Sequence, residues 1–475
     1  MGHPAQLASI TLPEGGYGTV DDVLLDELRQ IAGSDNVSTA VAVREQHGRD
    51  ESWHPSVPPD AVVFCAETDQ VAAVVKACAE RRVPVIPYGT GTSLEGHVAA
   101  LAGGVCIDVS RMDRILEVNA EDMDVSVQAG VRRKALNEYL RDTGLFFPID
   151  PGADASIGGM TATRASGTNA VRYGTMRENV LALTVVMADG RVIKTAKRAR
   201  KSAAGYDLTR LFVGSEGTLG VITEITLRLY GIPETVLAAV CSFPDLEGAV
   251  NTTILTIQSG IPVARIEVLD DVQMDAINKY SGLDYPVAPT LFFEFHGSVA
   301  SAREQVDQVS AIAREFGGDD FKWAERPKDR AKLWQARHDA YYAAIALRPG
   351  CRGIATDVCV PISRLADCIL ETQKDLQASN VCAPIVGHVG DGNFHIVFVV
   401  DPDNADELKT VQDINERMVM RALAMDGTCT GEHGVGYGKM DFLIAEHGEA
   451  VAAMRAVKLA LDPLNIMNPG KIICV

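Results

Sequence analysis

Apolar positions in the first half of the chain predict short strands and a few amphipathic helices. Helical spacing runs through residues 19–32 and 71–82. Compact apolar runs at 61–65, 83–87 and 104–109 predict strands. From residue 115 onward the pattern is mostly that of strands, at 115–119, 124–129, 182–187, 192–194 and 221–230, with one helix at 132–143. This mixture indicates an α+β domain, because no regular βαβ repeat is present.

The pattern changes around Gly231-Ile-Pro233, where we predict a domain boundary. Two blocks follow, each with a helix, a pair of strands and a second helix: 246–259, 264–268, 290–296 and 301–316, then 362–378, 384–388, 394–400 and 403–425. Two such halves predict an antiparallel sheet covered by helices on one face. The expected parts are a helical segment over 1–55, a first domain over 56–231, a second over 232–425 and a C-terminal segment over 426–475 with a helix near 450–461.

Length and charge narrow the class of protein. A chain of 475 residues exceeds one typical core, so two or more domains that share a cleft are expected. The formal net charge of -19 argues against nucleic acid as a partner, because backbone phosphates require a basic face. A small anionic substrate is still compatible with this charge if a few arginines or lysines converge in a pocket.

The cysteines and the apolar runs indicate the cellular compartment of the protein. The 10 cysteines include no CxxC pair and predict reduced, mostly buried thiols. The N-terminus, MGHPAQLASI, has neither a secretory nor an Arg-rich transit pattern. No apolar run approaches the roughly 20 residues of a membrane span. We expect no membrane span and a cytoplasmic protein, or a mitochondrial one if a transit peptide was trimmed.

The loop Gly89-Thr-Gly-Thr-Ser-Leu-Glu-Gly96 invites comparison with a dinucleotide fingerprint. The third glycine comes two places late, and residues 97–103 are too few for the crossover helix whose N-terminus would face the pyrophosphate. Asp108 stands where an acidic ribose ligand belongs, but without the helix the match fails. The loop is then expected to be a turn that joins two strands. Its backbone N–H groups and the hydroxyls of Thr90, Thr92 and Ser93 could form an anion-binding nest, and a plain surface turn is the alternative.

Two further loops favour a binding role. Pro151–Gly159 leads into Met160–Gly174, an unusually long run of small residues that lets a large flat ligand approach the backbone closely. The third loop, Gly214-Ser-Glu-Gly-Thr-Leu-Gly220, enters the strand at 221–230. The three loops, with Asn468-Pro-Gly-Lys471 near the end of the chain, resemble the flavoprotein superfamily of vanillyl-alcohol oxidase and p-cresol methylhydroxylase. Within it, the chain is most similar to FAD-dependent D-lactate dehydrogenases.

This resemblance implies an FAD-binding domain over residues 56–231 and a substrate domain over 232–425. It implies that segments 87–93, 152–159, 163–174 and 216–222 contact FAD and that Asn468 closes the site near the flavin ring. The implied contacts are Pro87, Gly89, Thr90, Gly91, Thr92, Ser93, Gly152, Asp154, Gly158, Gly159, Thr163, Ser166, Gly167, Tyr173, Gly174, Glu216, Gly217, Gly220, Ile222 and Asn468. Thr92 matches the place of a histidine that binds FAD covalently in some members, so we expect non-covalent FAD. His97, where similar proteins carry glycine, is interpreted as structural.

Three histidines fall in two glycine-rich motifs. In His388-Val-Gly-Asp-Gly-Asn-Phe-His395, Asp391-Gly392 predicts a two-residue hairpin that pairs His388 with His395. Their Cβ atoms would then be roughly 5 Å apart, which suits chelation of a divalent cation. Histidines that only satisfy hydrogen bonds in a cleft are the alternative. The family resemblance places the metal ligands at His388, His395 and Glu432, with Zn or Mn favoured among ions that also include Fe and Co.

The predicted chemistry assigns a role to each polar group. A 2-hydroxy acid would chelate the metal, and His433, beside a ligand, would act as general base. Hydride would pass from the substrate to FAD. Arg337 is the candidate for the substrate carboxylate, with an exposed helix arginine as the alternative. Asn393 and Lys439 are weaker candidates for orienting the substrate.

The substrate is predicted to be D-lactate or a related monocarboxylate. D-2-hydroxyglutarate dehydrogenases, the alternative within the superfamily, hold a second carboxylate with an Arg, a Thr four residues later and a Lys. Arg337 matches, but Tyr341 and Ala355 replace the other two. Tyr341, Tyr342 and Trp323 suggest a partly apolar pocket, and glycolate is also compatible.

Two other classes of protein are alternatives. A nicotinamide dehydrogenase would show no bound yellow chromophore. A non-catalytic flavoprotein subunit should lack the histidine pair and the Glu432-His433 motif, both of which are present. The expected partners are a small 2-hydroxy acid and a separate electron acceptor: a cytochrome, a quinone or an electron-transfer flavoprotein. A homodimer is compatible with the sequence.

Overall fold

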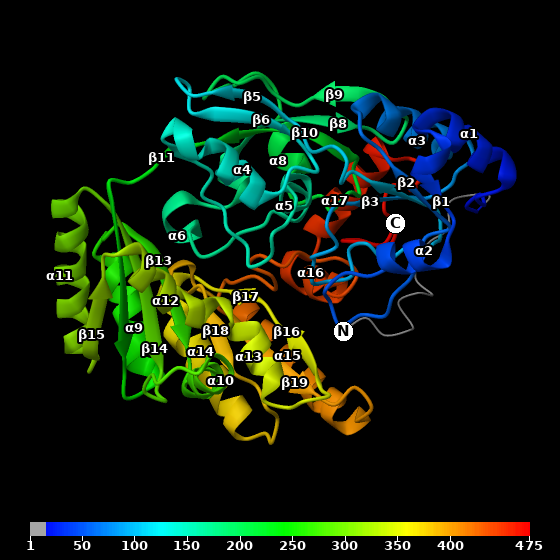
Figure 1. The fold of residues 1–475 in the computed structure, drawn as a ribbon. Coiled ribbons are helices and arrows are strands. Elements are labelled where there is room, and N and C mark those ends of the chain that lie inside the picture. Colours follow the sequence, from blue (N-terminus) through cyan, green and yellow to red (C-terminus); the bar gives the residue numbers. More distant parts are fainter. Residues whose placement is uncertain (1–15) are drawn as a thin grey trace. The chain divides into compact units, whose positions relative to one another are not determined.

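The computed structural model describes residues 16–475 and divides into two compact units (Figure 1). The first unit runs to Ala165 and adds Thr175–Ile232 and Glu432–Val475; the second comprises Ser166–Gly174 and Pro233–Gly431. The prediction that the N-terminus has no targeting pattern concerns mainly residues 1–15, which lie outside the described residues. No helix between residues 16 and 475 is long and apolar enough to cross a membrane.

A four-stranded sheet in the order β1-β2-β4-β3 opens the first unit. Its strands are β1 (Val37–Ser38), β2 (Ala61–Phe64), β3 (Val85–Tyr88) and β4 (Val105–Asp108), with β2, β4 and β3 parallel. The predicted helices are present as α1 (Asp22–Ala32) and α3 (Thr68–Glu80). The Asp21 side chain caps α1 by accepting from the N–H of Leu24, which satisfies one of the free donors at the helix start.

A five-stranded antiparallel sheet forms the rest of the core of the first unit. Its order is β5-β6-β10-β8-β9, with β5 (Ile115–Asn119), β6 (Asp124–Gln128), β8 (Val180–Val186), β9 (Val192–Lys194) and β10 (Val221–Arg228). Val105 of the first sheet, Val127 of the second and Val71 of α3 belong to one fully buried apolar cluster. The α+β class predicted from the sequence is confirmed.

Shorter elements complete the first unit. They are α2 (Val41–His47), α4 (Arg133–Leu140), β7 (Leu145–Phe146), α5 (Ile157–Thr163), α7 (Met176–Asn179), α8 (Leu208–Phe212), β11 (Tyr230–Gly231), α16 (Met440–His447) and α17 (Ala450–Leu461). The predicted helix at 450–461 is confirmed as α17. Helix α6 (Ala170–Tyr173) belongs to the second unit.

The second unit is built on an eight-stranded antiparallel sheet in the order β15-β12-β14-β13-β18-β19-β16, with β17 paired to β19. The strands are β12 (Thr235–Ser242), β13 (Val263–Leu269), β14 (Thr290–Gly297), β15 (Asp319–Ala324), β16 (Arg352–Ala355), β17 (Val358–Cys359), β18 (Ile385–Gly387) and β19 (Asn393–Val400). The helices are α9 (Leu246–Gln258), α10 (Asp271–Ser281), α11 (Val299–Glu315), α12 (Pro327–His338), α13 (Ala340–Ala346), α14 (Leu365–Gln377) and α15 (Ala405–Ala424). The antiparallel sheet is as predicted.

Helices cover both faces of this sheet, so the prediction of one covered face is wrong. Strand β14 is buried from Thr290 to His296, which includes side chains that alternate between the two faces. Phe292 packs into a cluster with Trp334 of α12, Ala344 of α13 and Met274 of α10. These three helices were not predicted, in part because α12, PKDRAKLWQARH, is mostly polar and shows little helical periodicity.

Candidate functional site

The glycine loop lies between β3 and β4, which are parallel neighbours. Residues 89–104 contain no helix, as predicted, so the crossover helix of a nicotinamide site is missing. Because the strands are parallel, the connection is a crossover and not the simple strand-to-strand turn that we expected. Gly91 has a φ of +66°, and a Cβ there would lie 2.3 Å from Oη of Tyr88, so the loop needs glycine at this place.

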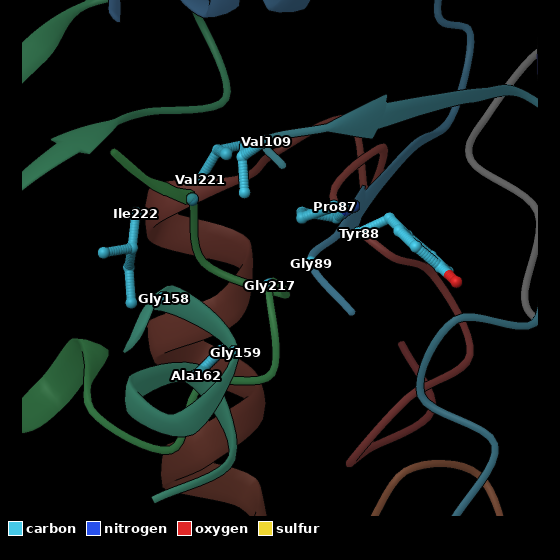
Figure 2. Close-up of a pocket in the computed structure, with 11 residues that line it drawn as sticks. Pro87, Tyr88, Gly89, Val109, Gly158, Gly159, Ala162, Gly217, Val221 and Ile222 are labelled. Atoms are coloured by element: carbon cyan, nitrogen blue, oxygen red, sulfur yellow. The ribbon is translucent and has the colours of Figure 1, made fainter. Parts of the chain in front are cut away.

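Glycines from three segments line one pocket in the first unit (Figure 2). A Cβ on Gly89 would lie 2.4 Å from Oγ of Ser156, and a Cβ on Gly217 would lie 2.8 Å from Cγ of Pro87. Any side chain larger than that of glycine at these two positions would therefore fill the space between the segments. The lining includes seven of the predicted FAD contacts: Pro87, Gly89, Gly158, Gly159, Gly217, Gly220 and Ile222. A cradle of backbone atoms and glycines fits a large flat cofactor.

The second glycine segment is partly helical, which the sequence did not predict. Helix α5 begins at Ile157, and the Ser156 side chain caps it by accepting from the N–H of Gly159. Gly158 packs so closely against Ala129, the residue that follows β6, that a Cβ would lie 2.6 Å from Cβ of Ala129. This close packing outweighs the low helix propensity of glycine, which is why a pattern of small residues was mistaken for a loop.

Other predicted FAD contacts do not line this pocket. Gly152 is exposed, Asp154 accepts from the N–H of Lys134, and the Thr163 hydroxyl donates to the carbonyl of Gly159. The Thr90 and Thr92 hydroxyls are 3.1 Å apart, and Ser93 donates to Asp50. Four residues belong to the second unit: Ser166, Gly167, Tyr173 and Gly174. Their contact with FAD stays a prediction.

Glu216 and Asn468 have their side chains engaged within the first unit. The buried Glu216 carboxylate accepts from the N–H groups of Val435 and Gly436, both at 2.8 Å, and lies 3.3 Å from Nε2 of His97. Burial tends to raise the pKa of Glu216, but His97 and the two N–H donors outweigh it and lower that pKa. Asn468 donates to the carbonyls of His97 and Glu216. Glu216 and His97 thus hold the C-terminal segment, which fits the structural role predicted for His97.

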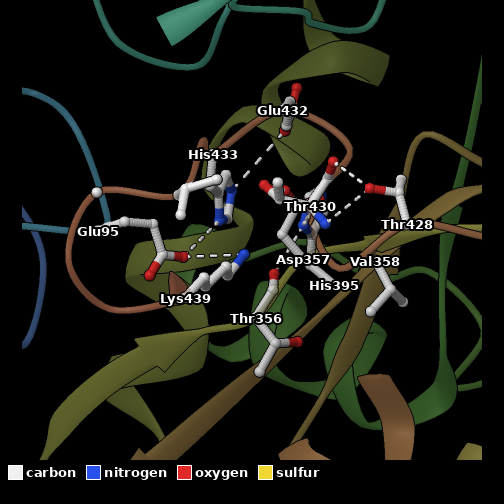
Figure 3. A network of polar contacts seen from close by, with 12 residues as sticks. Glu95, Thr356, Asp357, Val358, His395, Thr428, Thr430, Glu432, His433 and Lys439 are labelled. Carbon is white, nitrogen blue, oxygen red and sulfur yellow. Dashed lines mark hydrogen bonds and ion pairs between the residues drawn. The ribbon is translucent and has the colours of Figure 1, made fainter. Parts of the chain in front are cut away.

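A buried ionic cluster surrounds His433 in the first unit (Figure 3). The Glu95 carboxylate lies 3.0 Å from Nζ of Lys439 and 3.9 Å from Nδ1 of His433. His54 lies 4.0 Å from the same carboxylate, and burial lowers the pKa of His54 to about 4. Glu95 was not among the site residues predicted from the sequence. The available signal was an acidic residue inside a loop of small side chains.

The histidine pair lies in the second unit, at the turn between β18 and β19. The rings of His388 and His395 are 5.4 Å apart between centroids and nearly perpendicular. Val386 pairs with His395, and the N–H of Asn393 donates to the carbonyl of His388, so the predicted two-residue hairpin is wrong. The connection is a four-residue turn over 389–392 that ends at Gly392 with a φ of +80°. Compared with the predicted pairing of His388 with His395, the register is shifted by two residues. Successive side chains alternate between the two faces of a sheet, so a shift by an even number keeps both rings on the same face.

Both histidines have Nδ1 bound to an acceptor. His388 Nδ1 is 2.7 Å from Oε1 of Glu267, and His395 Nδ1 is 2.9 Å from the carbonyl oxygen of Thr356. A carbonyl and an ionised carboxylate only accept, so each Nδ1 carries the proton. In the neutral rings Nε2 then keeps its lone pair, the form that binds a metal.

Arg337 is hydrogen-bonded to the carboxylate of Glu267, which also contacts His388. Its Nε donates to Oε2 of Glu267 at 2.7 Å, so the alternative of a free, exposed helix arginine does not hold. Burial tends to raise the pKa of Glu267, but His388 and Arg337 outweigh it and lower that pKa. Glu267 was not predicted from the sequence, because it belongs to no motif and is one acidic residue in an apolar strand.

A second polar cluster contains Asp357 and Thr430 (Figure 3), and Asn393, at the start of β19, is hydrogen-bonded to it. Its Nδ2 donates to Oδ1 of Asp357 and to the carbonyl of Val358, both at 2.7 Å. Thr430 donates to the other oxygen of Asp357 at 2.6 Å. Oδ1 of Asn393 is buried and has no hydrogen-bond partner among the described residues. An acceptor is therefore available for a bound molecule.

The predicted aromatic side-chain pocket is only partly supported. Trp323 lies on the edge strand β15, four strands from β18, which corresponds to about 19 Å. It does not share a pocket with the histidine pair, and that part of the prediction is wrong. Tyr342 is largely exposed, whereas the Tyr341 hydroxyl approaches Gly353 of β16.

Known families match both units. Residues 59–196 match the FAD binding domain family, and residues 232–472 match the family of FAD linked oxidases, C-terminal domain. The chain belongs to the FAD-linked oxidases. It is an FAD-linked oxidoreductase.

Individual relatives cover almost the whole chain. The chain is 58% identical over 454 residues to a probable mitochondrial D-lactate dehydrogenase from Danio rerio, with 95% of this chain and 91% of that protein covered. It is 51% identical over 463 residues to the mitochondrial D-lactate dehydrogenase [cytochrome] of Arabidopsis thaliana, with 97% and 82% covered. The structure of p-cresol methylhydroxylase with substrate bound has the same fold, with a TM-score of 0.77, 18% identity and 97% and 98% coverage.

Proposed function

We propose that this FAD-linked oxidoreductase oxidises a D-2-hydroxy acid, D-lactate or a related monocarboxylate, to the 2-oxo acid. The observation that carries the proposal is the common tautomer of His388 and His395, in which Nδ1 donates to the protein. Two Nε2 lone pairs on one face of a sheet suit a divalent ion beside a substrate hydroxyl. The relatives named as D-lactate dehydrogenases support the choice of substrate.

The third metal ligand is proposed to be Glu432. Gly431 belongs to the second unit, where a Cβ on it would lie 2.4 Å from Nδ2 of Asn393. Glu432 follows directly, so its Cα is only about 3.8 Å further along the chain. Two imidazoles and one carboxylate could hold a divalent ion, Zn or Mn, with coordination positions left open. When bound, the ion would supply Lewis-acid chemistry that makes a substrate hydroxyl more acidic.

His433 is proposed as the general base that takes the hydroxyl proton. It follows a proposed ligand without being one, and the Glu95 carboxylate 3.9 Å from Nδ1 would stabilise the charged ring after proton transfer. Lys439 lies 3.0 Å from the same carboxylate, which supports a role in fixing Glu95 more than direct contact with the substrate. FAD, held non-covalently, would supply the acceptor for the two electrons that leave the substrate.

Arg337 is proposed to bind the substrate carboxylate. Its Nε donates to Glu267, which fixes the plane of the guanidinium. The terminal nitrogens can then form a forked pair of hydrogen bonds with a carboxylate. Asn393 would orient the substrate through Oδ1, the buried acceptor that no described residue satisfies.

A separate acceptor must take the electrons from reduced FAD. The name of the Arabidopsis relative includes a cytochrome, and we extend that class of acceptor to this chain. Both relatives are named as mitochondrial, and the same compartment is proposed here, in place of the cytoplasm.

Anaerobic bleaching of the flavin absorbance tests the substrate. D-lactate and D-2-hydroxybutyrate should bleach the oxidised enzyme, whereas L-lactate should not. D-2-hydroxyglutarate should bleach it poorly, because Tyr341 and Ala355 replace the Thr and the Lys that help to hold a second carboxylate in the alternative family. A clear preference for D-2-hydroxyglutarate or glycolate would favour those alternatives, and bleaching by L-lactate alone would contradict the proposal.

A further inference from the structure

We propose that Glu267 is a positioning residue that holds a metal-binding histidine and a substrate-binding arginine at a fixed spacing. The inference rests on the function proposed above. Oε1 of Glu267 accepts from Nδ1 of His388, and Oε2 accepts from Nε of Arg337, both at 2.7 Å. One carboxylate thus contacts both groups, one through each oxygen.

The strand register explains this contact. In the antiparallel pairing of β13 with β18, Leu269 pairs with Val386 and Val268 with Gly387. Continuing the register by one residue puts Glu267 directly opposite His388, which follows the last residue of β18. Side chains in such a pair have Cβ atoms about 5 Å apart, a span that a glutamate and a histidine can bridge.

The burial of Glu267 indicates a role beyond filling space. Its side chain has 0% exposure, and a buried carboxylate is unfavourable unless donors surround it. The two donors here are His388 and Arg337, the residues proposed to hold the metal and the substrate. As the acceptor for Nδ1, Glu267 selects the tautomer that presents Nε2 of His388 and prevents rotation of the ring.

The same carboxylate sets the orientation of Arg337. A hydrogen bond to Nε fixes the guanidinium plane, so its terminal nitrogens point in a defined direction. The metal ligand and the carboxylate anchor are then held through one rigid side chain. A 2-hydroxy acid needs this fixed spacing, because its hydroxyl and carboxylate are attached to the same carbon.

The neighbouring strand provides a matched control. Glu294 on β14 is also buried, accepts from Nε2 of His296 at 2.7 Å and lies 3.5 Å from Nε of Arg265. It has the same partner types as Glu267 on the same sheet, but neither partner is a proposed metal ligand. Glu267→Gln and Glu294→Gln therefore make the same chemical change with different expected effects on the metal.

Direct metal titration tests the proposal. The FAD-loaded protein is stripped with a chelator, dialysed and titrated with Mn²⁺ while the EPR signal of the free ion is recorded. We expect Glu267→Gln to weaken Mn²⁺ binding by about 10–100-fold, because the amide cannot accept from both partners as a carboxylate does. Glu294→Gln should bind Mn²⁺ like the unaltered protein, although thermal unfolding should show that both variants lose stability.

Each outcome has a separate meaning. Unaltered Mn²⁺ affinity in a folded Glu267→Gln protein would overturn the role of Glu267 and leave the proposed function intact. Failure of the unaltered protein to bind Mn²⁺ or Zn²⁺ would overturn the metal site and this inference with it. If Glu267→Gln does not fold, Glu267→Asp replaces it: the shorter side chain cannot reach both partners, so weaker binding is expected and unaltered binding would overturn the proposal.

Discussion

Glu95 and Lys439 form a buried ion pair, with 3.0 Å between Oε1 of the carboxylate and Nζ of the ammonium. Glu95 comes from the glycine loop after β3, and Lys439 comes from the C-terminal segment of the same unit. The pair ties the predicted FAD loop to the segment that carries His433. Both charged groups are largely shielded from water. Loss of one of them therefore costs more free energy than in a surface pair.

Removal of one charge from this pair should be destabilising. Glu95→Gln removes a negative charge that lies 3.0 Å from the buried Lys439 ammonium, and we expect the free energy of unfolding to fall by about 3–5 kcal/mol. Asp26→Asn removes an exposed pair with Arg29 and should cost less than about 1 kcal/mol. Denaturant unfolding of both variants provides the comparison. A Glu95→Gln effect no larger than that of Asp26→Asn would contradict the buried pair.

His54 should make the fold sensitive to acid. Burial lowers its pKa to about 4 from 6.5, so between these values the unfolded chain binds more protons than the folded one. Stability should therefore rise with pH from about 4 to about 6.5, by an amount on the order of 3 kcal/mol. His54→Phe keeps a ring against Tyr437, whose centroid lies 4.5 Å away, and should flatten this part of the profile. Melting temperatures across that pH range, with equal slopes for both proteins, would exclude His54 as the cause.

FAD binding should depend on the space around Gly89. A Cβ there would lie 2.4 Å from Oγ of Ser156, so Gly89→Ala should close part of the pocket and sharply lower the FAD content of the purified protein. Gly231→Ala is the control, because no atom lies within 4 Å of its Cβ position. The ratio of flavin to protein absorbance reports the result. Full occupancy in the folded Gly89→Ala protein would show that this pocket is not where FAD binds.

Substrate choice should shift when the missing anchors are supplied. Ala355 pairs with Val397, two residues from His395 on the same strand, so a lysine there would lie on the face of the histidine pair. We expect Tyr341→Thr combined with Ala355→Lys to raise kcat/KM for D-2-hydroxyglutarate relative to D-lactate by about tenfold, the value of one charged hydrogen bond. Ala355→Leu is the control for size. An unchanged ratio would mean that the side chain of the substrate lies elsewhere.

The sequence predicted those features that follow from local pattern. Strands β5 and β9 and helix α17 were placed at their observed bounds, because regular apolar spacing defines them. The histidine pair was also found, although its turn was wrong: Asp391-Gly392 is compatible with more than one turn length, and only the strand register decides.

Features that depend on tertiary contacts were missed. Helix α5 depends on close packing of Gly158 against Ala129, and no local signal reports that packing. Glu95 and Glu267 are single acidic residues whose partners lie far away in the chain. The position of Trp323 depends on the order of the strands in the sheet. Short apolar runs in the sequence do not reveal that order.

The joint action of FAD and the metal can be measured by anaerobic reduction of the flavin by D-lactate, before and after verified removal of the metal. We propose that FAD and a divalent ion held by His388, His395 and Glu432 act together on a D-2-hydroxy acid. The metal-free protein should retain FAD yet bleach at least about a hundredfold more slowly, and added Zn²⁺ or Mn²⁺ should restore the rate. Undiminished bleaching by D-lactate in the metal-free protein would contradict this proposal.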